Sequence, residues 1–200
     1  MAGTVEQWDV SVLLWINGHN TPFLDQLMLF SSNKLTWIPF YLFILYLVFK
    51  EKSSRGFVVL LFVAATIALS DQTSVHAFKF VFHRLRPCHD PTLEGLVRTI
   101  ENHCGGSYGF ISSHAANSFA LIGFLLLTLR RTFPGFRAVL WIWGFLVLYS
   151  RVYLGVHFPS DVLTGAVVGL ALGFSMGKLY KITEQHFLQN NGEIKNQTLK

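Results

Sequence analysis

The segment Ser150–Asp161, SRVYLGVHFPSD, lies between two apolar runs and brings three chemically active side chains close together in the sequence. His157 and Asp161 are four residues apart, and Arg151 precedes the histidine by six residues. An arginine binds oxyanions, and an imidazole backed by a carboxylate can act as a nucleophile or as a base. A histidine and an aspartate at this spacing can also form a purely structural contact, so the rest of the chain has to distinguish the two interpretations.

The composition indicates a membrane protein. The chain has 200 residues, of which 52% are hydrophobic and only 14% are charged, whereas soluble domains contain about 25% charged residues. The net charge of +5 comes without a basic run or interleaved aromatic and basic residues, so we expect no nucleic-acid partner. Because Glu6 and Asp9 stand where a signal peptide has a basic head, we expect no cleavable signal peptide.

The apolar runs predict an all-α fold, a polytopic membrane bundle of about five to six helices. A bilayer core needs about 20 helical residues. The predicted spans cover residues 35–49, 56–70 with further turns toward Lys79, 115–129, 138–153 and 162–180. Residues 24–30 either begin the first span or stand apart from it. We expect one domain over residues 1–182 and a polar C-terminal tail over 183–200 that frays from Lys181 onward.

Residues 4–17 are too short to cross a bilayer. Val5, Trp8, Val12 and Trp15 recur at helical spacing, which favours an N-terminal amphipathic helix that lies in the interface with its tryptophans at headgroup depth. An ordinary packing helix is the alternative.

Loop charges predict the orientation, because cytoplasmic loops are enriched in lysine and arginine. With five spans, one side carries Lys50, Lys52, Arg55, Arg130, Arg131, Arg137, Lys178 and Lys181. We therefore expect this side to be cytoplasmic and the N-terminus, the loop 83–111 and the loop 151–161 to face outward. That outer side still carries Lys79, Arg84, Arg86, Arg98 and Arg151. Cations gathered where topology disfavours them suggest an anion site.

Cys88 and Cys104 lie in the polar loop 83–111. A disulfide would suit an oxidising compartment. A metal site completed by the nearby His83, His89 or His103, or two free thiols, are the alternatives.

Two further stretches fall on the predicted outer side. In Lys79–Pro87, KFVFHRLRP, Lys79 and Arg86 are seven residues apart, which corresponds to two helical turns. We expect both to point to one side of a helix that Pro87 ends. In Phe110–Asn117, FISSHAAN, Ser112 or Ser113 can cap the next helix, whose first N–H groups then form an anion site beside His114.

The opening segment supplies the third stretch. Phe158 precedes Pro159, so a helix is expected to begin near that proline. His157 then lies just outside the helix and Asp161 lies in its first turn. The carboxylate can bind one imidazole nitrogen, fix the tautomer and leave the other nitrogen free to attack.

Together these stretches resemble the three signature motifs of the type 2 phosphatidic acid phosphatase (PAP2) superfamily. Lys79, Arg86 and Pro87 match the pattern Lys-x6-Arg-Pro, and Ser150, Arg151, His157 and Asp161 match Ser-Arg-x5-His-x3-Asp. The pattern Pro-Ser-Gly-His is matched in part by Ile111-Ser112-Ser113-His114.

The resemblance implies an all-α core and the hydrolysis of a phosphate ester through a phosphohistidine, without a metal or cofactor. Together with the loop charges, it leads us to expect a bacterial inner membrane protein whose site faces the periplasm. The resemblance assigns His157 as the nucleophile, Asp161 as its orienting partner and His114 as the acid that protonates the leaving oxygen. The residues that it implies for holding the phosphoryl oxygens are Lys79, Arg86, Arg151, Ser112 and the backbone N–H of Ser113.

The second motif departs from the family at two positions. Ile111 replaces a proline, which should only loosen the turn. Ser113 replaces a glycine. If that position needs a positive φ, serine would be strained; if it needs only a small side chain, serine adds a donor, and we expect the second case.

A site at the outward-facing surface of the membrane favours a phosphate on a lipid, such as phosphatidic acid, phosphatidylglycerophosphate, a polyprenyl diphosphate or a lipid A phosphate. The sequence does not choose among them, nor does it give an oligomeric state. The alternatives are a lipid phosphotransferase that uses the same phosphohistidine and a non-catalytic membrane lipid-binding protein.

Overall fold

The computed structural model describes residues 3–100, 104–129 and 134–197, and over these residues the chain is all-α with no strand. The helices are α1 (Thr4–Gly18), α2 (Pro22–Ser32), α3 (Ile38–Lys52), α4 (Gly56–Gln72), α5 (Phe80–Phe82), α6 (Ser113–Thr128), α7 (Phe136–Tyr153) and α8 (Pro159–Gln197). A 3₁₀ turn, Lys34–Trp37, precedes α3, and a π-helical segment, Thr73–Lys79, joins α4 to α5. The predicted all-α class is confirmed.

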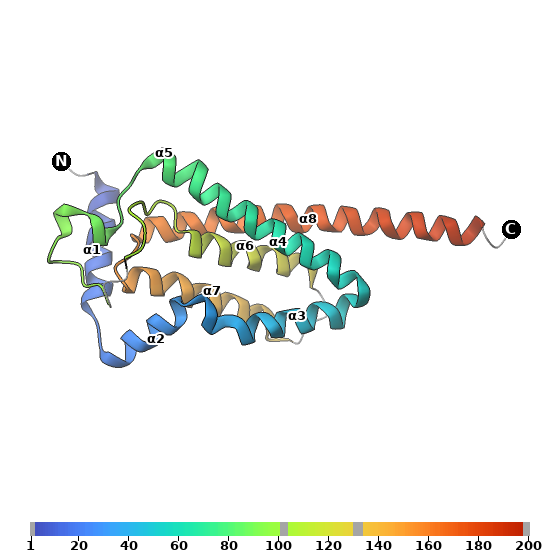
Figure 1. Cartoon of the computed structure of the whole chain (residues 1–200), viewed down its shortest axis with the longest axis horizontal. Helices are drawn as coiled ribbons and strands as arrows, with labels where there is room; N and C mark the ends of the chain where they lie inside the picture. Colours follow the sequence, from blue (N-terminus) through green and yellow to red (C-terminus); the bar gives the residue numbers. More distant parts are fainter. Residues whose placement is uncertain (1–2, 101–103, 130–133, 198–200) are drawn as a thin grey trace.

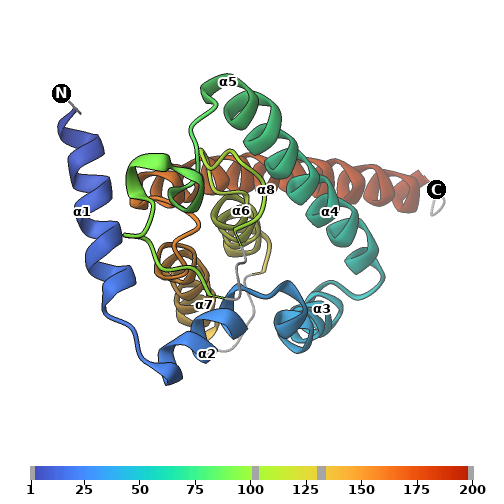
Figure 2. The same ribbon diagram turned by 60° about the vertical axis from the view of Figure 1, so that its left-hand side comes forward.

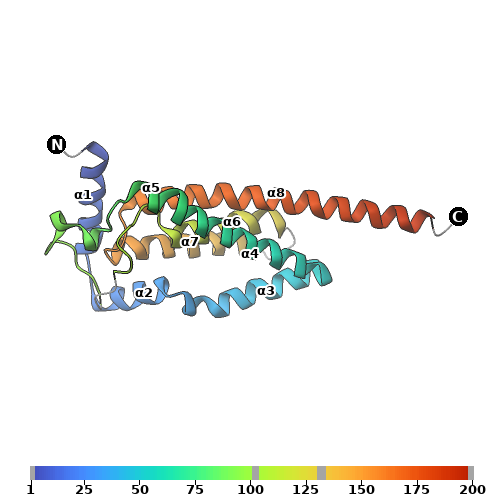
Figure 3. The ribbon, with the colours of Figure 1, turned by 45° about the horizontal axis from the view of Figure 1, so that its top comes forward.

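The long helices run lengthwise beside one another, and α1 lies across one end of them (Figure 1). The loop between α5 and α6 lies at the same end as α1, together with the junction of α7 and α8. Seen obliquely along the bundle, α6 is central, and it contacts α4, α7 and α8 (Figure 2). Figure 3 shows α8 projecting well beyond the other helices toward the C-terminus.

The predicted spans coincide with α3, α4, α6, α7 and α8. Two described helical stretches, Lys34–Phe82 and Pro159–Phe187, are long and apolar enough to cross a membrane, and α6 is apolar but shorter. Residues 24–30 belong to the separate helix α2. It ends at Ser32, and the side chain of the following Asn33 accepts a hydrogen bond from Leu35 N (2.9 Å) and so starts the next turn.

Helix α1 exposes the side chains expected of an interfacial helix. Trp8 and Trp15 are 47% and 64% exposed, whereas Asp9, Leu13 and Asn17 form its buried side. The apolar stripe therefore faces outward, and a partly polar line of residues faces the protein.

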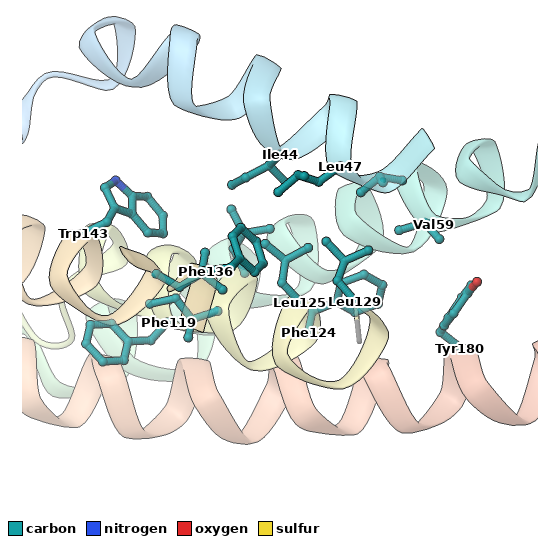
Figure 4. Close-up of a cluster of buried hydrophobic side chains, with 14 of the residues drawn as sticks. Ile44, Leu47, Val59, Phe119, Phe124, Leu125, Leu129, Phe136, Trp143 and Tyr180 are labelled. Carbon is teal, nitrogen blue, oxygen red and sulfur yellow. The ribbon is translucent and has the colours of Figure 1, made fainter. Parts of the chain in front are cut away.

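One apolar cluster joins the five long helices (Figure 4). Ile44 and Leu47 of α3 and Val59 of α4 face Phe119, Phe124 and Leu125 of α6, with Trp143 of α7 and Tyr180 of α8 completing the cluster. Burying these side chains holds the bundle at the end opposite to α1 and along its middle.

The expectation that the chain frays from Lys181 was wrong, because α8 continues as a helix to Gln197. The stretch contains no proline, and its polar residues include good helix formers. Glu184 also anchors it: its carboxylate accepts hydrogen bonds from Lys52 Nζ (3.1 Å) and Tyr180 Oη (2.9 Å).

Those charges used to predict orientation that the structure describes lie at the end of the bundle away from α1. Lys52 and Arg55 both approach Glu184 there, at 3.1 and 3.6 Å. Arg130 and Arg131 fall outside the described residues. The assignment of this end to the cytoplasm stays a prediction.

Candidate active site

His157 and Asp161 lie at the junction of α7 and α8, as the proline in this segment predicted. Helix α8 begins at Pro159, and Phe158 N donates a hydrogen bond to Asp161 Oδ2 (3.0 Å). The same oxygen lies 3.4 Å from His157 Nδ1. Both side chains are buried, with 1% and 0% of their surface exposed. The carboxylate thus directs Nδ1–H toward itself and leaves the lone pair on Nε2.

The second imidazole nitrogen faces a cation. His157 Nε2 lies 3.3 Å from Arg86 Nη1, which also approaches Val156 O at 3.5 Å. Burial lowers the pKa of His157 well below its usual value, and the charges of Arg86, Arg151 and Lys79 lower it further, while a backbone hydrogen bond with Gly109 opposes them. The imidazole is therefore neutral at neutral pH, as a nucleophile must be.

Arg86 reaches this position from an extended segment and not from a helix. We expected Lys79 and Arg86 to share one helix up to Pro87, but the helix ends at Phe82, and His83 has a left-handed φ of 49°. Residues 84–86 then pair with the segment 107–109: Arg86 N donates to Ser107 O (3.0 Å), and Gly109 N donates to Arg84 O (2.8 Å). These backbone bonds replace those of the expected helical turns, so that part of the prediction was wrong.

Ser112 caps α6 and ties it to the catalytic junction. Its hydroxyl accepts a hydrogen bond from Ala115 N (3.5 Å), and its own N–H donates to Asp161 O (3.1 Å). The first helical i→i−4 bond is that of Ala116 N to Ser112 O. The N–H groups of Ser113 and His114 precede it and form the positive end of the helix.

Ser113 is accommodated without a positive φ. It is the first residue of α6, and the described non-glycine residues with positive φ are Ser53 and His83. Its hydroxyl accepts a hydrogen bond from Lys79 Nζ (2.8 Å) and lies 2.7 Å from Ser74 Oγ. The serine is therefore compatible with the local backbone and holds the lysine at the start of α6.

A cavity of about 750 Å³ opens beside these groups. Lys79, Arg86, Ser113 and His114 line it at the end near α1. Farther along the bundle it is walled by apolar side chains of α3, α4, α6 and α7, namely Leu42, Ile44, Leu45, Val48, Leu60, Val63, Ile67, Leu121, Trp143 and Val147.

Arg151 completes the group of cations. Its guanidinium donates a hydrogen bond to Ser32 Oγ through Nη1, and its Nε is buried with no partner among the described residues. Its charge acts on His157. The structure thus brings all eight predicted site residues to one end of the bundle.

A family model described as the PAP2 superfamily matches residues 56–182, a range that contains all three motifs. The chain is 34% identical over 179 residues to a lipid A 4'-phosphatase of Porphyromonas gingivalis, covering 89% of this chain and 75% of that protein. It is 29% identical over 190 residues to an undecaprenyl-diphosphatase of Sulfolobus acidocaldarius, covering 88% and 84%. The crystal structure of a transmembrane PAP2 type phosphatidylglycerolphosphate phosphatase from Bacillus subtilis superposes with a TM-score of 0.64 at 24% identity, covering 91% and 88%.

The chain belongs to the PAP2 superfamily. The family model and the named relatives place it among membrane lipid phosphatases, and the helical bundle that it shares with the Bacillus subtilis structure confirms the predicted fold.

In this PAP2 protein, Cys88 and Cys104 form a disulfide with their Cα atoms 6.0 Å apart. This settles the alternatives left open for the two cysteines. No cluster of potential metal ligands occurs among the described residues, and His103 lies outside them.

The sequence motifs of the PAP2 protein miss several residues that contact the site. Arg84 binds Asp161, and Asp9 of α1 binds Arg84. Gly109 lies so close that a Cβ there would be 3.0 Å from Asp161 Oδ2. The available signal was the excess of cations on the outer side, which includes Arg84; nothing in the sequence linked Asp9 to it.

Proposed function

We propose that this protein hydrolyses a phosphate ester or diphosphate on a membrane lipid through a phosphohistidine at His157. The observation that carries the proposal is the cavity, because it joins a cationic, histidine-containing end to a long apolar wall. A phosphate on a lipid needs both surroundings at once. We further propose that the site faces the periplasm from the inner membrane.

In the first step, His157 Nε2 attacks phosphorus and the bond between phosphorus and the lipid oxygen breaks. Burial and the nearby cations lower the pKa of His114 to about 2 in the protein without substrate, so in this scheme His114 takes up its proton when the negatively charged phosphate binds beside it. His114 donates this proton to the departing oxygen, which leaves as the lipid alcohol from a monoester or as the lipid monophosphate from a diphosphate. Asp161 stabilises the charged imidazole through Nδ1–H. Lys79, Arg86, Arg151, Ser112 and the N–H of Ser113 hold the phosphoryl oxygens, where charge gathers during transfer.

In the second step, water attacks the phosphohistidine. His114, now neutral, accepts a proton from the water, and the bond between phosphorus and Nε2 breaks. The products are inorganic phosphate and free His157. In this scheme neither step uses a metal, because the cations of the protein neutralise the phosphoryl oxygens.

We propose a lipid A-type sugar phosphate as the first substrate to test, because the relative from Porphyromonas gingivalis is named for that activity. A polyprenyl diphosphate comes second, since the relative from Sulfolobus acidocaldarius is an undecaprenyl-diphosphatase. Both carry a phosphate at the head of long apolar chains, which suits the cavity.

The test is phosphate release by the purified protein from a panel of lipid A, undecaprenyl diphosphate, phosphatidylglycerophosphate and phosphatidic acid, with and without EDTA. We expect turnover of at least one lipid, unaffected by EDTA, and a loss of at least about 10³-fold in His157→Ala, because the nucleophile is gone. Turnover by His157→Ala at the wild-type rate would contradict the mechanism. Adding an acceptor lipid distinguishes phosphotransfer, which would yield phosphorylated acceptor in place of free phosphate.

A further inference from the structure

Arg84 joins two buried carboxylates that come from distant parts of the chain. Its Nη2 donates a hydrogen bond to Asp9 Oδ2 (2.6 Å), and its Nη1 donates to Asp161 Oδ1 (2.8 Å). Both carboxylates are 0% exposed, whereas the Arg84 side chain is 27% exposed. A buried carboxylate is costly without a paired cation, and the one guanidinium pairs with both the aspartate of α1 and the aspartate of the third motif.

Asp9 also holds the start of α8. Its Oδ1 accepts a hydrogen bond from Ser160 N (2.8 Å), and its Oδ2 accepts one from the Ser160 hydroxyl. Arg84 Nη1 donates to the same hydroxyl at 2.7 Å. Ser160 is the second residue of α8, directly before Asp161. The carboxylate of α1 therefore fixes both the arginine and the helical turn that carries Asp161.

The two oxygens of Asp161 have different partners. Oδ1 binds Arg84, while Oδ2 accepts from Phe158 N and lies beside His157 Nδ1. Arg84 and Arg86 are two residues apart in the extended segment 84–86, so their side chains emerge on the same side. One of them reaches the carboxylate and the other reaches the imidazole. With Oδ1 held, the carboxylate cannot rotate away from the imidazole.

We propose that Arg84, held by Asp9 of α1, is a positioning residue that sets the orientation of the Asp161–His157 pair. The N-terminal helix is then part of the catalytic apparatus and not only an interfacial anchor. The inference rests on the proposed function, because it assumes that His157 is the nucleophile. Arg84 is not among the residues that line the cavity, and its hydrogen bonds go to Asp9, Ser160 and Asp161; it acts through Asp161.

The molecule contains a matched pair for comparison. Arg98 binds Asp25 through Nη1–Oδ1 (2.9 Å) and Nη2–Oδ2, and Tyr153 Oη donates to Asp25 Oδ1 at 2.8 Å. This pair also links distant segments at the same end of the bundle. Among the residues that the structure describes, Arg98 and Asp25 make no hydrogen bond or ion pair with His157 or Asp161. A purely structural role for Arg84 predicts that disrupting either pair has the same kinetic consequences.

The experiment compares Arg84→Ala with Asp25→Asn in detergent-purified full-length protein, using the lipid turned over fastest by the wild type. We expect Arg84→Ala to lower kcat about 10²-fold with KM within about threefold, because a misplaced reacting group costs about this much. Asp25→Asn should keep both within about threefold. Ethylguanidinium, added at millimolar concentration, should restore part of the kcat of Arg84→Ala, because the site is partly open to solvent. Thermal unfolding of both variants controls for stability.

Asp9→Asn gives a second test if Arg84→Ala does not fold, because the amide keeps the shape of the carboxylate. We expect a loss in kcat of about tenfold at unchanged KM. A change of less than threefold in both variants, or a loss of activity that follows unfolding and is not restored by ethylguanidinium, would overturn the inference. An inactive His157→Ala with fully active Arg84 and Asp9 variants refutes this inference alone, whereas an active His157→Ala refutes the proposed function.

Discussion

The two sides of the bundle are packed in opposite ways. Helices α6 and α8 approach each other through their backbones: a Cβ at Gly169 would lie 2.2 Å from Ala116 O, and one at Gly173 would lie 2.1 Å from Ala120 O. On the side of α3 and α4, by contrast, side chains surround a cavity of about 750 Å³. Small residues at four-residue spacing allow such close helix contact in membranes.

The closely packed side fixes the positions of the catalytic groups, whereas the side with the cavity leaves room for the substrate. His114 lies in the first turn of α6 and Asp161 in the first turn of α8, so the close pairing of these helices fixes the two groups relative to each other. The hydrogen bond from Ser112 N to Asp161 O (3.1 Å) joins the two helix starts directly. On the side of α3 and α4, Lys79 lines the cavity together with His114, and the cavity leaves room for an apolar chain.

The largest expected effect comes from disrupting the close packing of α6 against α8. Gly169→Ala adds a single Cβ against the backbone of Ala116, which cannot move without separating the helices. We expect a loss of about 3 kcal/mol in the free energy of unfolding, at the upper end for overpacking, despite the better helix propensity of alanine. Thermal unfolding and the yield of folded protein in detergent measure it.

Gly18→Ala is the control, because a Cβ at the end of α1 meets nothing within 4 Å. It should leave the unfolding midpoint unchanged or slightly raised. Equal midpoints for Gly169→Ala and Gly18→Ala would show that backbone contact between α6 and α8 does not stabilise the protein.

Much of this architecture could be predicted from local pattern. Apolar run length located the helices, and the residue before Pro159 located the start of α8, because both depend on nearby residues alone. Capping chemistry in the same way predicted that α6 starts at Ser112 or Ser113, and Ser112 is the residue that caps it.

The contacts that complete the site could not be predicted, because they depend on segments far apart in the sequence. Arg86 lies in an extended segment because residues 107–109 pair with it, which no helical spacing reveals. Asp9 meets Ser160 across 151 residues. The continuation of α8 beyond Lys181 differs from the expectation for another reason, because a polar composition does not reveal that Lys52 binds Glu184.

A smaller effect is expected from filling the open side. Val63 of α4 lines the cavity, so Val63→Trp should obstruct an apolar chain without touching the cations. We expect kcat/KM for the long-chain lipid phosphate to fall about tenfold, while a short, water-soluble phosphate ester is hydrolysed as before. The ratio of the two values is the measurement.

Val58→Trp is the matched control, since Val58 lies on the same helix, is 43% exposed and is not among the residues that line the cavity. If Val63→Trp lowers kcat/KM equally for both substrates, the cavity does not hold the lipid chain. If Val58→Trp lowers kcat/KM for the long-chain substrate as strongly as Val63→Trp does, the effect comes from a disturbance of α4 as a whole and not from the cavity.

The smallest expected effect is the change in stability with pH that the protonation of His157 causes. This residue precedes α8 on the closely packed side. Burial and the cations around it hold its pKa well below the usual value of about 6.5. Folding therefore lowers this pKa, so the unfolded chain binds the proton first as the pH falls, and stability decreases below about pH 6.5.

Titration of isotope-labelled histidines by NMR, with His157→Gln to assign the signal, should show a neutral imidazole at pH 6.5. The unfolding midpoint should fall less between pH 7 and pH 5 in His157→Gln than in the wild type. Protonation of His157 above pH 6.5 would mean that water reaches the imidazole and that the packing of α6 against α8 does not seal it.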